Sequence, residues 1–553
     1  MEPSKPIINV STYLREMAAR QPYKRAVVYP VGRDHGGRVA YSHLTFRQLD
    51  RESDCLAHGM TNAGITRGVR TILMVKPSLE FFALVFAMFK VGAVPVVVDP
   101  GMGIKRMVSC LQEGKAKALI GIPPAHVLRK IYPKFFTSVD IWVTVGKKWF
   151  WSGLTFKQLR QTPWKKFSIT DTGKDDIAAI LFTTGSTGPA KGAVYTHGVF
   201  DAQLQAIRSN FDFSPDEIDL TTFPLFALFY PALGITSVIP DMDPTKPARV
   251  NPPKIIEAVV NHGVTNMFAS PALLNRVGTY GKKHGVKLPS LKRVISAGAP
   301  VTADVIDLFS NMLMNDAQIH TGYGATEAMP VLLMGSREIL SDTRHLSEKG
   351  FGVCVGRPVN TIDINIIKIT DDQIADWTDD LPVEEGEIGE LVVKGGLVTR
   401  RYFQKPRHDA LAKIRDGEGF WHRMGDLGWM DNKGRYWFCG RKNHRVITRD
   451  KTLFTVPCEA VFNCHPSVFR TALVGIGTAP NQTPVICVEL QAGHKRINKK
   501  AFLLEMKELA DGNVLTENIK HFLIHPAFPV DIRHNSKIFR EQLAEWAGKK
   551  LNR

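Results

Sequence analysis

The stretch TILMVKPSLEFFALVFAMFKVGAVPVVVD, residues 71–99, predicts a strand, a helix and a second strand in succession. Its two ends are short apolar runs rich in β-branched residues, and its middle is a longer apolar segment of helical length. The same order recurs at residues 265–285 and 291–314. Repeated units of this kind predict an α/β fold with largely parallel sheets. Because the strands are continuously apolar, we expect sheets that are covered on both faces.

Residues 81–98 are the most lipid-like part of the chain. Lys90, Gly92 and Pro95 interrupt this segment, whereas a membrane-spanning helix needs about 20 predominantly apolar residues in succession. We therefore expect a buried helix followed by a buried strand. The first 20 residues also lack the apolar core of a signal peptide.

The chain is basic, with 71 lysines and arginines against 53 acidic residues and a formal net charge of +18. This balance favours anionic partners such as nucleotides, acidic substrates or lipid headgroups, although a solvated basic surface explains most of these residues. Nucleic-acid binding is not expected, because no recognition motif accompanies the charge. No CxxC pair occurs among the seven cysteines, which argues against a zinc site or a disulfide framework and fits a reducing, cytoplasmic location.

The sequence pattern changes near residue 384. Residues 384–396 and 434–450 are typical of β-hairpins with turn glycines, and a compact series of strands and helices follows. We predict an N-terminal domain, residues 1–440, of layered βαβ subdomains plus a β-barrel-like part. A small, mobile α+β domain is predicted for residues 441–553.

Glycines, hydroxyls and one lysine gather in LFTTGSTGPAKGAVYTHG, residues 181–198. An apolar run before them reads as a strand ending at Thr183 and Thr184, and the residues after them lead into a helix. Glycines let the backbone approach an anion, consecutive N–H groups form an anion site, and Lys191 adds a mobile charge. The GK[ST] ending of P-loop NTPases is absent. A flexible linker has a similar composition, so the loop alone does not decide between the two.

Three later segments carry groups suited to a nucleotide. HTGYGATEAMP (residues 320–330) holds a tyrosine that can stack on a base, a threonine that can reach a phosphate and a glutamate that can ligate Mg²⁺. WHRMGDLGWMD (residues 421–431) offers a carboxylate for ribose hydroxyls, and GRKNHR (residues 440–445) offers an arginine. The residues concerned are Tyr323, Gly324, Thr326, Glu327, Asp426 and Arg441. Each segment alone is an ordinary turn, but their order and spacing together predict a nucleotide site.

These motifs resemble those of the acyl-adenylate-forming superfamily, which includes acyl-CoA synthetases, nonribosomal adenylation domains and luciferases. The resemblance covers nearly the whole chain. It is carried by FKVGAVPVVVDP (89–100), the loop at 181–192, SAGAP (296–300), YGATE (323–327), GDLG (425–428), GRK (440–442) and NSKIFR (535–540).

The resemblance implies ATP and Mg²⁺ as cofactors and a role for each matching residue. The implied catalytic residues are Lys537, Glu327, Thr326 and Lys191. The phosphates would be held by Thr183, Thr184, Gly185, Ser186, Thr187 and Gly188, and the adenine by Gly298, Ala299, Pro300, Tyr323 and Gly324. Asp426 and Arg441 would hold the ribose, and Glu327 and Thr184 the metal. Lys537 would bridge the substrate carboxylate and the α-phosphate, offsetting the repulsion between two anions.

The chain departs from the commonest pattern of this superfamily in three places. Asn443 stands at the hinge position, and residues 450–452 replace the glycine-rich turn that shapes a thiol tunnel. Ala227 stands where histidine is common, and no acidic residue there could hold an α-ammonium group. Ser536 precedes Lys537 in place of a glycine. Transfer of the acyl group to CoA is therefore doubtful, and an amino-acid substrate is not expected.

An aromatic stripe surrounds Ala227. It consists of Phe223, Phe226, Phe229 and Tyr230. Such a stripe is either the wall of an acyl pocket or ordinary core packing, and the sequence leaves both open.

The departures together resemble the β-lactone synthetases of bacterial long-chain olefin biosynthesis. The matching phrases are PLFALFYPALG, GRKNHRV, LFTVPCEAVFNCHP and DIRHNSKIFRE. The resemblance implies that a long-chain β-hydroxy (2-alkyl-3-hydroxy) fatty acid is activated as its acyl-AMP, and that its own β-hydroxyl then closes a β-lactone. A fatty acyl-CoA (or acyl-AMP) ligase is the alternative. His197 and His444 are candidates for the base that deprotonates the hydroxyl, and the sequence favours neither.

The stretch RKIYPKFFTSVDIWVTVGKKWFWSG, residues 129–153, clusters basic and aromatic residues. It fits a peripheral membrane contact, or an edge of the N-terminal domain where lysine stems lie along apolar surface. A non-catalytic membrane- or anion-binding protein is a third hypothesis. It is disfavoured because Lys191, Glu327, Asp426 and Lys537 are all present. The resemblance also implies assembly with a β-lactone decarboxylase.

Overall fold

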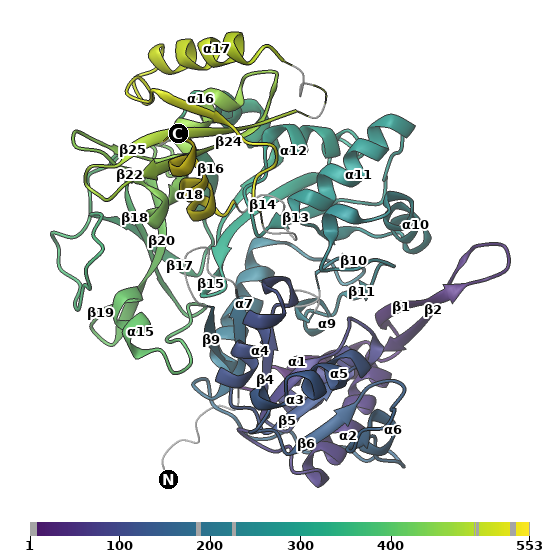
Figure 1. The fold of residues 1–553 in the computed structure, drawn as a ribbon. Helices are drawn as coiled ribbons and strands as arrows, with labels where there is room; N and C mark the ends of the chain where they lie inside the picture. The colour runs from purple at the N-terminus through teal and green to yellow at the C-terminus, as the bar shows by residue number, and fades with distance from the viewer. Residues whose placement is uncertain are drawn as a thin grey trace.

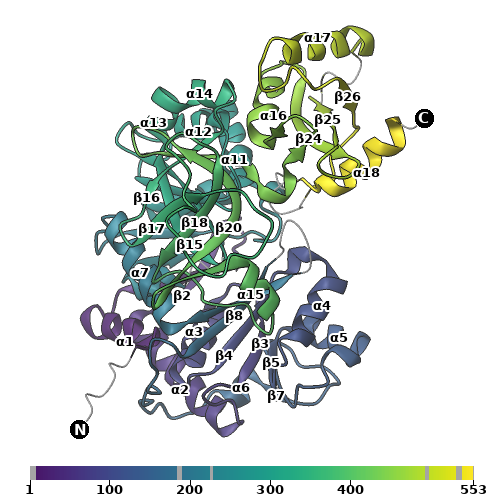
Figure 2. The ribbon, with the colours of Figure 1, turned by 90° about the vertical axis from the view of Figure 1, so that its left-hand side faces the viewer.

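The computed structural model describes residues 8–183, 190–223, 228–491, 493, 497–530 and 538–551. The described residues form a mixed α/β fold with a large N-terminal part and a smaller C-terminal part (Figures 1 and 2). Several predicted site residues lie outside these ranges, namely Phe226 and Ala227 of the aromatic stripe, Thr184, Gly185, Ser186, Thr187 and Gly188 of the phosphate loop, and Lys537.

Residues 71–99 form β3 (Arg70–Met74), α3 (Leu79–Lys90) and β4 (Val94–Val98), as predicted. Both strands belong to a sheet with the order β7-β6-β5-β3-β4-β8-β9. Neighbouring strands in it are parallel except for β8 and β9. The other strands are β5 (Ala118–Gly121), β6 (Ile141–Thr144), β7 (Leu154–Thr155), β8 (Ile177–Thr183) and β9 (Lys191–Thr196).

Helices cover this sheet on both faces, as the apolar strands predicted. Leu73 packs in one cluster with residues of α2 (Phe46–Asn62) and α3. Its neighbour Ile72 packs in another, with residues of α4 (Ile104–Glu113) and α5 (Pro123–Ile131). Successive residues of a strand point to opposite faces, so a sheet with helices on both sides needs apolar residues throughout. Within the described ranges no helix has the length and apolar character needed to cross a membrane.

The phosphate-loop segment lies between two antiparallel strands. The sequence predicted a strand that is followed, after the loop, by a helix. The structure instead inserts β9 before α7 (His197–Asn210), and Thr183 pairs with Lys191. Ala193, Val194 and Tyr195 are buried in the sheet as part of β9. The helix therefore begins only after the Thr196 cap. The strands on either side of the loop therefore form an antiparallel pair.

A second, larger sheet has the order β17-β18-β20-β21-β16-β15-β14-β13-β12-β10-β11-β1-β2. Its parallel half confirms the two strand–helix units predicted for residues 265–285 and 291–314, namely β12–α11 and β13–α12. This half contains β1 (Arg25–Arg33), β10 (Ile218–Thr221), β11 (Thr236–Val238), β12 (Asn266–Phe268), β13 (Arg293–Ala297) and β14 (Gln318–Ala325), and β2 (Val39–Thr45) pairs antiparallel with β1 at its edge. Against it pack α10 (Pro252–His262), α11 (Pro271–His284) and α12 (Ala303–Ser310).

The other half of the larger sheet is antiparallel. Its strands are β15 (Ala328–Gly335), β16 (Val353–Pro358), β17 (Ile362–Ile367), β18 (Gly389–Gly395), β20 (Gly419–Met430) and β21 (Tyr436–Arg441), with β19 (Lys413–Asp416) paired to β20. The hairpin predicted for residues 384–396 is wrong, because this segment contributes a single strand, and the strand within residues 434–450 pairs with the strand that precedes it. The chain then turns at Lys442–His444. The boundary predicted after residue 440 falls next to the last residue of β21, and the division into domains stays a prediction.

The C-terminal part lies at one end of the molecule, opposite α2 and α6 (Phe156–Leu159), in both views (Figures 1 and 2). Its sheet has the order β24-β25-β26 and a separate hairpin joins β22 to β23. The elements are β22 (Val446–Ile447), β23 (Thr452–Leu453), α16 (Thr455–Asn463), β24 (Val468–Ile476), β25 (Thr483–Leu490), α17 (Lys499–Asp511), β26 (His521–Ile524) and α18 (Arg540–Leu551). The helices α16 and α17 match those predicted after residue 440.

Candidate active site

Thr326 and Glu327 form the two-residue tip of the β14–β15 hairpin. Ala325 pairs with Ala328 across this tip. The Tyr195 hydroxyl of β9 donates a hydrogen bond to the carbonyl oxygen of Thr326. The tip is thereby tied to the strand that follows the phosphate loop, although the two segments are far apart in sequence.

Tyr323, Asp426 and Arg441 form one polar cluster. The Tyr323 hydroxyl donates to Oδ2 of Asp426 over 2.8 Å, and Nε of Arg441 lies 3.0 Å from Oδ1 of the same carboxylate. Asp426 is 3% exposed. The Asp426 charge raises the pKa of Arg441, and burial together with that charge raises the pKa of Tyr323 well above its ordinary value. A carboxylate offers about four lone-pair positions, so Asp426 can also accept from ribose hydroxyls.

Glu327 is held by a residue that the sequence analysis did not single out. The Tyr402 hydroxyl donates to Oε1 of Glu327 over 2.6 Å. Nζ of Lys191 lies 5.0 Å from the centre of the Tyr402 ring. Burial lowers the pKa of Lys191, while Glu327 and Asp409 oppose that shift. The lysine and the glutamate predicted for phosphates and metal thus both lie beside Tyr402, the lysine near its ring and the glutamate at its hydroxyl.

A second buried lysine lies near the same carboxylate. Lys413 of β19 donates from Nζ to the carbonyl oxygen of Thr399, and the backbone N–H of Thr399 donates to the carbonyl of Glu327 over 2.8 Å. Burial lowers the pKa of Lys413 to about 7, and the charges of Glu327 and Asp409 oppose the shift. Neither Lys413 nor Tyr402 stands in a recognisable motif, so only the folded chain could reveal them.

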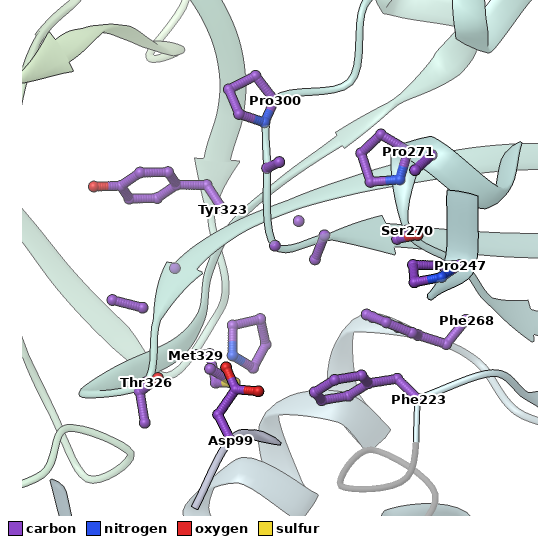
Figure 3. Close-up of a pocket in the computed structure, with 18 of the residues that line it drawn as sticks. Asp99, Phe223, Pro247, Phe268, Ser270, Pro271, Pro300, Tyr323, Thr326 and Met329 are labelled. Atoms are coloured by element: carbon purple, nitrogen blue, oxygen red, sulfur yellow. The ribbon is translucent and has the colours of Figure 1, made fainter. Parts of the chain in front are cut away.

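A cavity of about 2660 Å³ runs past this cluster, from the large sheet to the C-terminal part. The loop Gly298, Ala299 and Pro300 borders it on the side of Tyr323, and Figure 3 shows Pro300 and Tyr323 on neighbouring segments. Gly298 has φ of +93°, in the left-handed region that glycine adopts without strain. Gly324 also lines the cavity. The residues expected to frame adenine are therefore together.

The described part of the aromatic stripe lines the same cavity. Phe223 lies 6.1 Å, ring centre to ring centre, from Phe268, and both face the open space in Figure 3. Phe229 of α9 (Phe229–Ala232) lies 6.1 Å from Phe200. Tyr230 is 5% exposed and borders the cavity too. These side chains form a wall that can accept a hydrocarbon chain, and Phe226 and Ala227 lie outside the described residues.

Behind Tyr230 lies a buried polar network. Asp219 of β10 accepts hydrogen bonds from the Thr221 hydroxyl over 2.8 Å and from the Asn266 amide. Burial raises the pKa of Asp219 to about 8. It also raises the pKa of Tyr230 well above its ordinary value, with the Asp219 charge as the next cause. The aromatic wall is thus backed by polar groups that hold its position.

Several segments of the C-terminal part border the cavity. Asn443 borders it within the turn Lys442–His444, while Lys442 is anchored by its ammonium group to Glu390 over 3.0 Å. Ile538 and Arg540, which follow the lysine motif in the sequence, border it as well. Lys537 itself lies outside the described residues, and of Thr183 only the backbone is described.

The two histidines considered as bases lie in different settings. His197 is 1% exposed, and its Nδ1 accepts from the backbone N–H of Val10 over 3.4 Å. Burial lowers the pKa of His197 to about 4. His444 borders the cavity, with Nε2 3.6 Å from Oε1 of Glu541. His197 therefore packs as a structural residue.

The donor set at the hairpin tip fits Mg²⁺. This cation takes oxygen ligands and is usually bound through one or two carboxylates together with substrate phosphates. Glu327 supplies one carboxylate, beside Lys191 and the phosphate-loop strands. In the part of the chain that the structure describes, no three or more His, Cys, Asp and Glu side chains form a self-contained metal site. The arrangement suits a cation that is shared with a nucleotide.

The basic and aromatic stretch at residues 129–153 contains both buried and exposed side chains. Arg129 is buried, and its guanidinium lies 3.8 Å from the centre of the Trp142 ring. Trp149 and Phe150 are 52% and 82% exposed. The stretch therefore contains a packed edge and also two exposed aromatic side chains.

Comparison with known proteins shows which enzymes this chain is similar to. The chain is 46% identical over 553 residues to an olefin beta-lactone synthetase of Stenotrophomonas maltophilia (strain K279a), covering 99% of both chains. It is 45% identical over 548 residues to an olefin beta-lactone synthetase of Xanthomonas campestris pv. campestris, covering 98% of both. Among solved structures, the amide bond synthetase McbA from Marinactinospora thermotolerans superposes with a TM-score of 0.79 at 20% identity, over 97% of this chain and 99% of that one. At this identity the likeness to McbA shows the fold alone.

A family model described as "AMP-binding enzyme" matches residues 14–403. That range contains the phosphate-loop strands, the Thr326–Glu327 hairpin and Tyr402. With a match of this extent and two relatives at 45–46% identity over nearly the whole chain, the protein belongs to the AMP-binding enzyme family.

Proposed function

We propose that this enzyme activates a long-chain β-hydroxy (2-alkyl-3-hydroxy) fatty acid with ATP and closes it to a β-lactone, releasing AMP and pyrophosphate. The observation that carries the proposal is the 46% identity, over 99% of both chains, to an olefin beta-lactone synthetase. The apolar wall formed by Phe223, Phe229 and Phe268 beside the nucleotide cluster supports a hydrocarbon substrate.

In the first step, the substrate carboxylate attacks the α-phosphate of ATP. Asp426 and Arg441 would hold the ribose, Tyr323 and residues 298–300 the adenine, and Lys191 and the loop after Thr183 the phosphates. Thr326 would contact the α-phosphate. Mg²⁺ bound at Glu327 and Thr184 would offset the charge of the phosphates. Lys537 would bridge the two anions, so that its interaction strengthens as the transition state forms.

In the second step, the β-hydroxyl oxygen of the substrate attacks the carbonyl carbon of its own acyl-AMP. The ring that forms is strained, but the mixed anhydride is activated, and holding hydroxyl and carbonyl together supplies much of the rate. No external nucleophile is required. The segment after Arg441 is consistent with this, because residues 450–452, at the end of the β22–β23 connection and the start of β23, replace the glycine-rich turn expected of a thiol tunnel.

The test is a reaction of the purified protein with ATP, Mg²⁺ and a synthetic long-chain β-hydroxy acid, with and without CoA. Products are identified by proton NMR and mass spectrometry. A β-lactone and AMP formed without CoA support the proposal. An acyl-CoA that appears only when CoA is added would instead identify a fatty acyl-CoA ligase, and acyl-AMP without lactone an acyl-AMP ligase.

We also propose that Trp149 and Phe150, with the lysines beside them, contact a membrane surface that holds the lipid substrate. Exposed aromatic side chains flanked by basic ones favour anionic bilayers. A cytoplasmic location and assembly with a β-lactone decarboxylase complete the proposal. Co-sedimentation with anionic vesicles tests the membrane contact, which should weaken in the double variant Trp149→Ser, Phe150→Ser and be unchanged in Tyr23→Ser, an exposed aromatic on another segment.

A further inference from the structure

Asp99 presents a carboxylate to the cavity from the N-terminal sheet. It follows directly after β4 and is 8% exposed. Its Oδ1 accepts a hydrogen bond from the backbone N–H of Gly101 over 2.8 Å, which caps the short turn Pro100–Met102. This bond is one of the contacts that orient the carboxylate. Figure 3 shows the side chain pointing into the space between Thr326 and Met329 on one side and Phe223 on the other.

The reacting atoms of the proposed substrate would occupy that space. The acyl carbonyl must lie next to the α-phosphate, hence near Thr326, while the hydrocarbon chain follows the wall that contains Phe223. The β-carbon lies only two bonds from the carbonyl carbon. Its hydroxyl is therefore confined to the region between Thr326 and Phe223, which is the region that Asp99 faces.

From this placement we propose that Asp99 is the catalytic base for lactone closure. Asp99 takes the proton of the β-hydroxyl as the hydroxyl oxygen forms a bond to the carbonyl carbon. The bond between that carbon and the phosphate oxygen of AMP breaks, and AMP leaves with the electron pair. The proton on Asp99 then passes to solvent. The inference rests on the proposed function, because a ligase with an external nucleophile has no β-hydroxyl to deprotonate.

The other titratable candidates are less well placed. His197 does not border the cavity and is held against Val10. His444 borders the cavity from the C-terminal part, where it faces Glu541. Glu327 accepts a hydrogen bond from Tyr402 and is proposed to bind Mg²⁺. Asp99, in contrast, points into the space between Thr326 and Phe223 (Figure 3).

The test uses Asp99→Asn in single-turnover reactions of the full chain, quenched with acid and analysed for acyl-AMP and β-lactone separately. Asparagine keeps an oxygen that can cap Gly101, so the fold should be retained, and Asp99→Ser provides a second cap-competent variant without a base. We expect ATP–pyrophosphate exchange to stay within about twofold of wild type. Lactone closure should slow by about a hundredfold or more, so that acyl-AMP accumulates. The matched control is Asp241→Asn, a carboxylate at the exposed edge of the cavity that binds Lys254, and closure should be unchanged in it.

Two results would overturn the assignment. One is lactone closure at the wild-type rate in both Asp99 variants. The other is a parallel loss of exchange and closure without accumulation of acyl-AMP, which would make Asp99 a residue of substrate binding. Failure of the proposed function has a different signature, since wild-type protein would then form no lactone at all.

Discussion

The Tyr402 hydroxyl donates a 2.6 Å hydrogen bond to the Glu327 carboxylate, although the two residues are 75 positions apart in the chain. Tyr402 pairs across an isolated bridge with Ala193 of β9, and Val398 pairs likewise with Ala328 of β15. The segment that contains Tyr402 therefore pairs both with the strand after the phosphate loop and with the strand after the hairpin tip. Its hydroxyl orients the carboxylate proposed to bind Mg²⁺.

Replacing Tyr402 by phenylalanine should weaken the use of Mg²⁺. The ring would remain, but the carboxylate would lose the hydrogen bond that orients it, and loss of such a supporting partner typically costs about tenfold or more in metal affinity. We expect the Mg²⁺ concentration for half-maximal ATP–pyrophosphate exchange to rise by about that factor. Tyr436→Phe, which removes only a 3.5 Å bond to the Ile364 carbonyl, is the control. An unchanged Mg²⁺ dependence in Tyr402→Phe would refute the orienting role.

Asp426→Asn should weaken the binding of ATP and AMP to a similar degree. The substitution removes the charge that Arg441 and Tyr323 share and weakens the acceptor proposed for the ribose. Hydrogen bonds to charged groups contribute about 1.5–3 kcal/mol, so we expect a loss of roughly tenfold to a hundredfold. Equilibrium binding of a fluorescent adenine nucleotide, competed with ATP, AMP or pyrophosphate, measures it. A loss confined to ATP and pyrophosphate would place Asp426 at the phosphates instead.

The pKa of Asp219 predicts how stability depends on pH. Burial raises it from its ordinary value of 3.8 to about 8, so between these values the folded chain keeps a proton that the unfolded chain has lost. The free energy of unfolding should then fall as pH rises from about 4 to about 8, by at most about 1.4 kcal/mol per pH unit from this group. The Asp219→Asn side chain has the shape of the protonated acid but carries no proton that is lost in this pH range.

Urea unfolding of wild type and Asp219→Asn at several pH values between 5 and 8 measures this difference. We expect the wild-type stability to fall relative to that of the variant as pH rises. Parallel curves would show that Asp219 keeps an ordinary pKa in the folded chain.

Lys537→Ala should slow acyl-AMP formation by about a hundredfold or more while ATP affinity stays near that of wild type. The reason is that Lys537 is proposed to act mainly as charge develops in the transition state. Single-turnover adenylation and equilibrium ATP binding are measured on the same preparation, with Lys520→Ala as a control from the exposed surface of the C-terminal part. A collapse of ATP affinity with a surviving single-turnover rate would show that the proposed role is wrong.

The order of strands and helices could be predicted from the sequence because each strand–helix unit is formed by residues that are close together in the chain. The apolar runs around β3, α3 and β4 predict both their own structure and a sheet covered on two faces, and both predictions are confirmed. Strand β9 was missed for an equally local reason. It is short and lies between a glycine-rich loop and a helix, so only its pairing with β8 identifies it as a strand.

The sequence by itself determined the α/β architecture, the order of the nucleotide motifs and membership of the AMP-binding family, because these depend on local patterns and on residue types at fixed spacing. Only the tertiary structure decided which distant groups meet. The Tyr402 hydroxyl contacts Glu327, and Lys413 lies buried near the same carboxylate. Asp99 points toward the aromatic wall that contains Phe223. These contacts join segments by sheet pairing and loop closure, and the energy that selects them comes from packing and buried charge, which no short stretch of sequence contains.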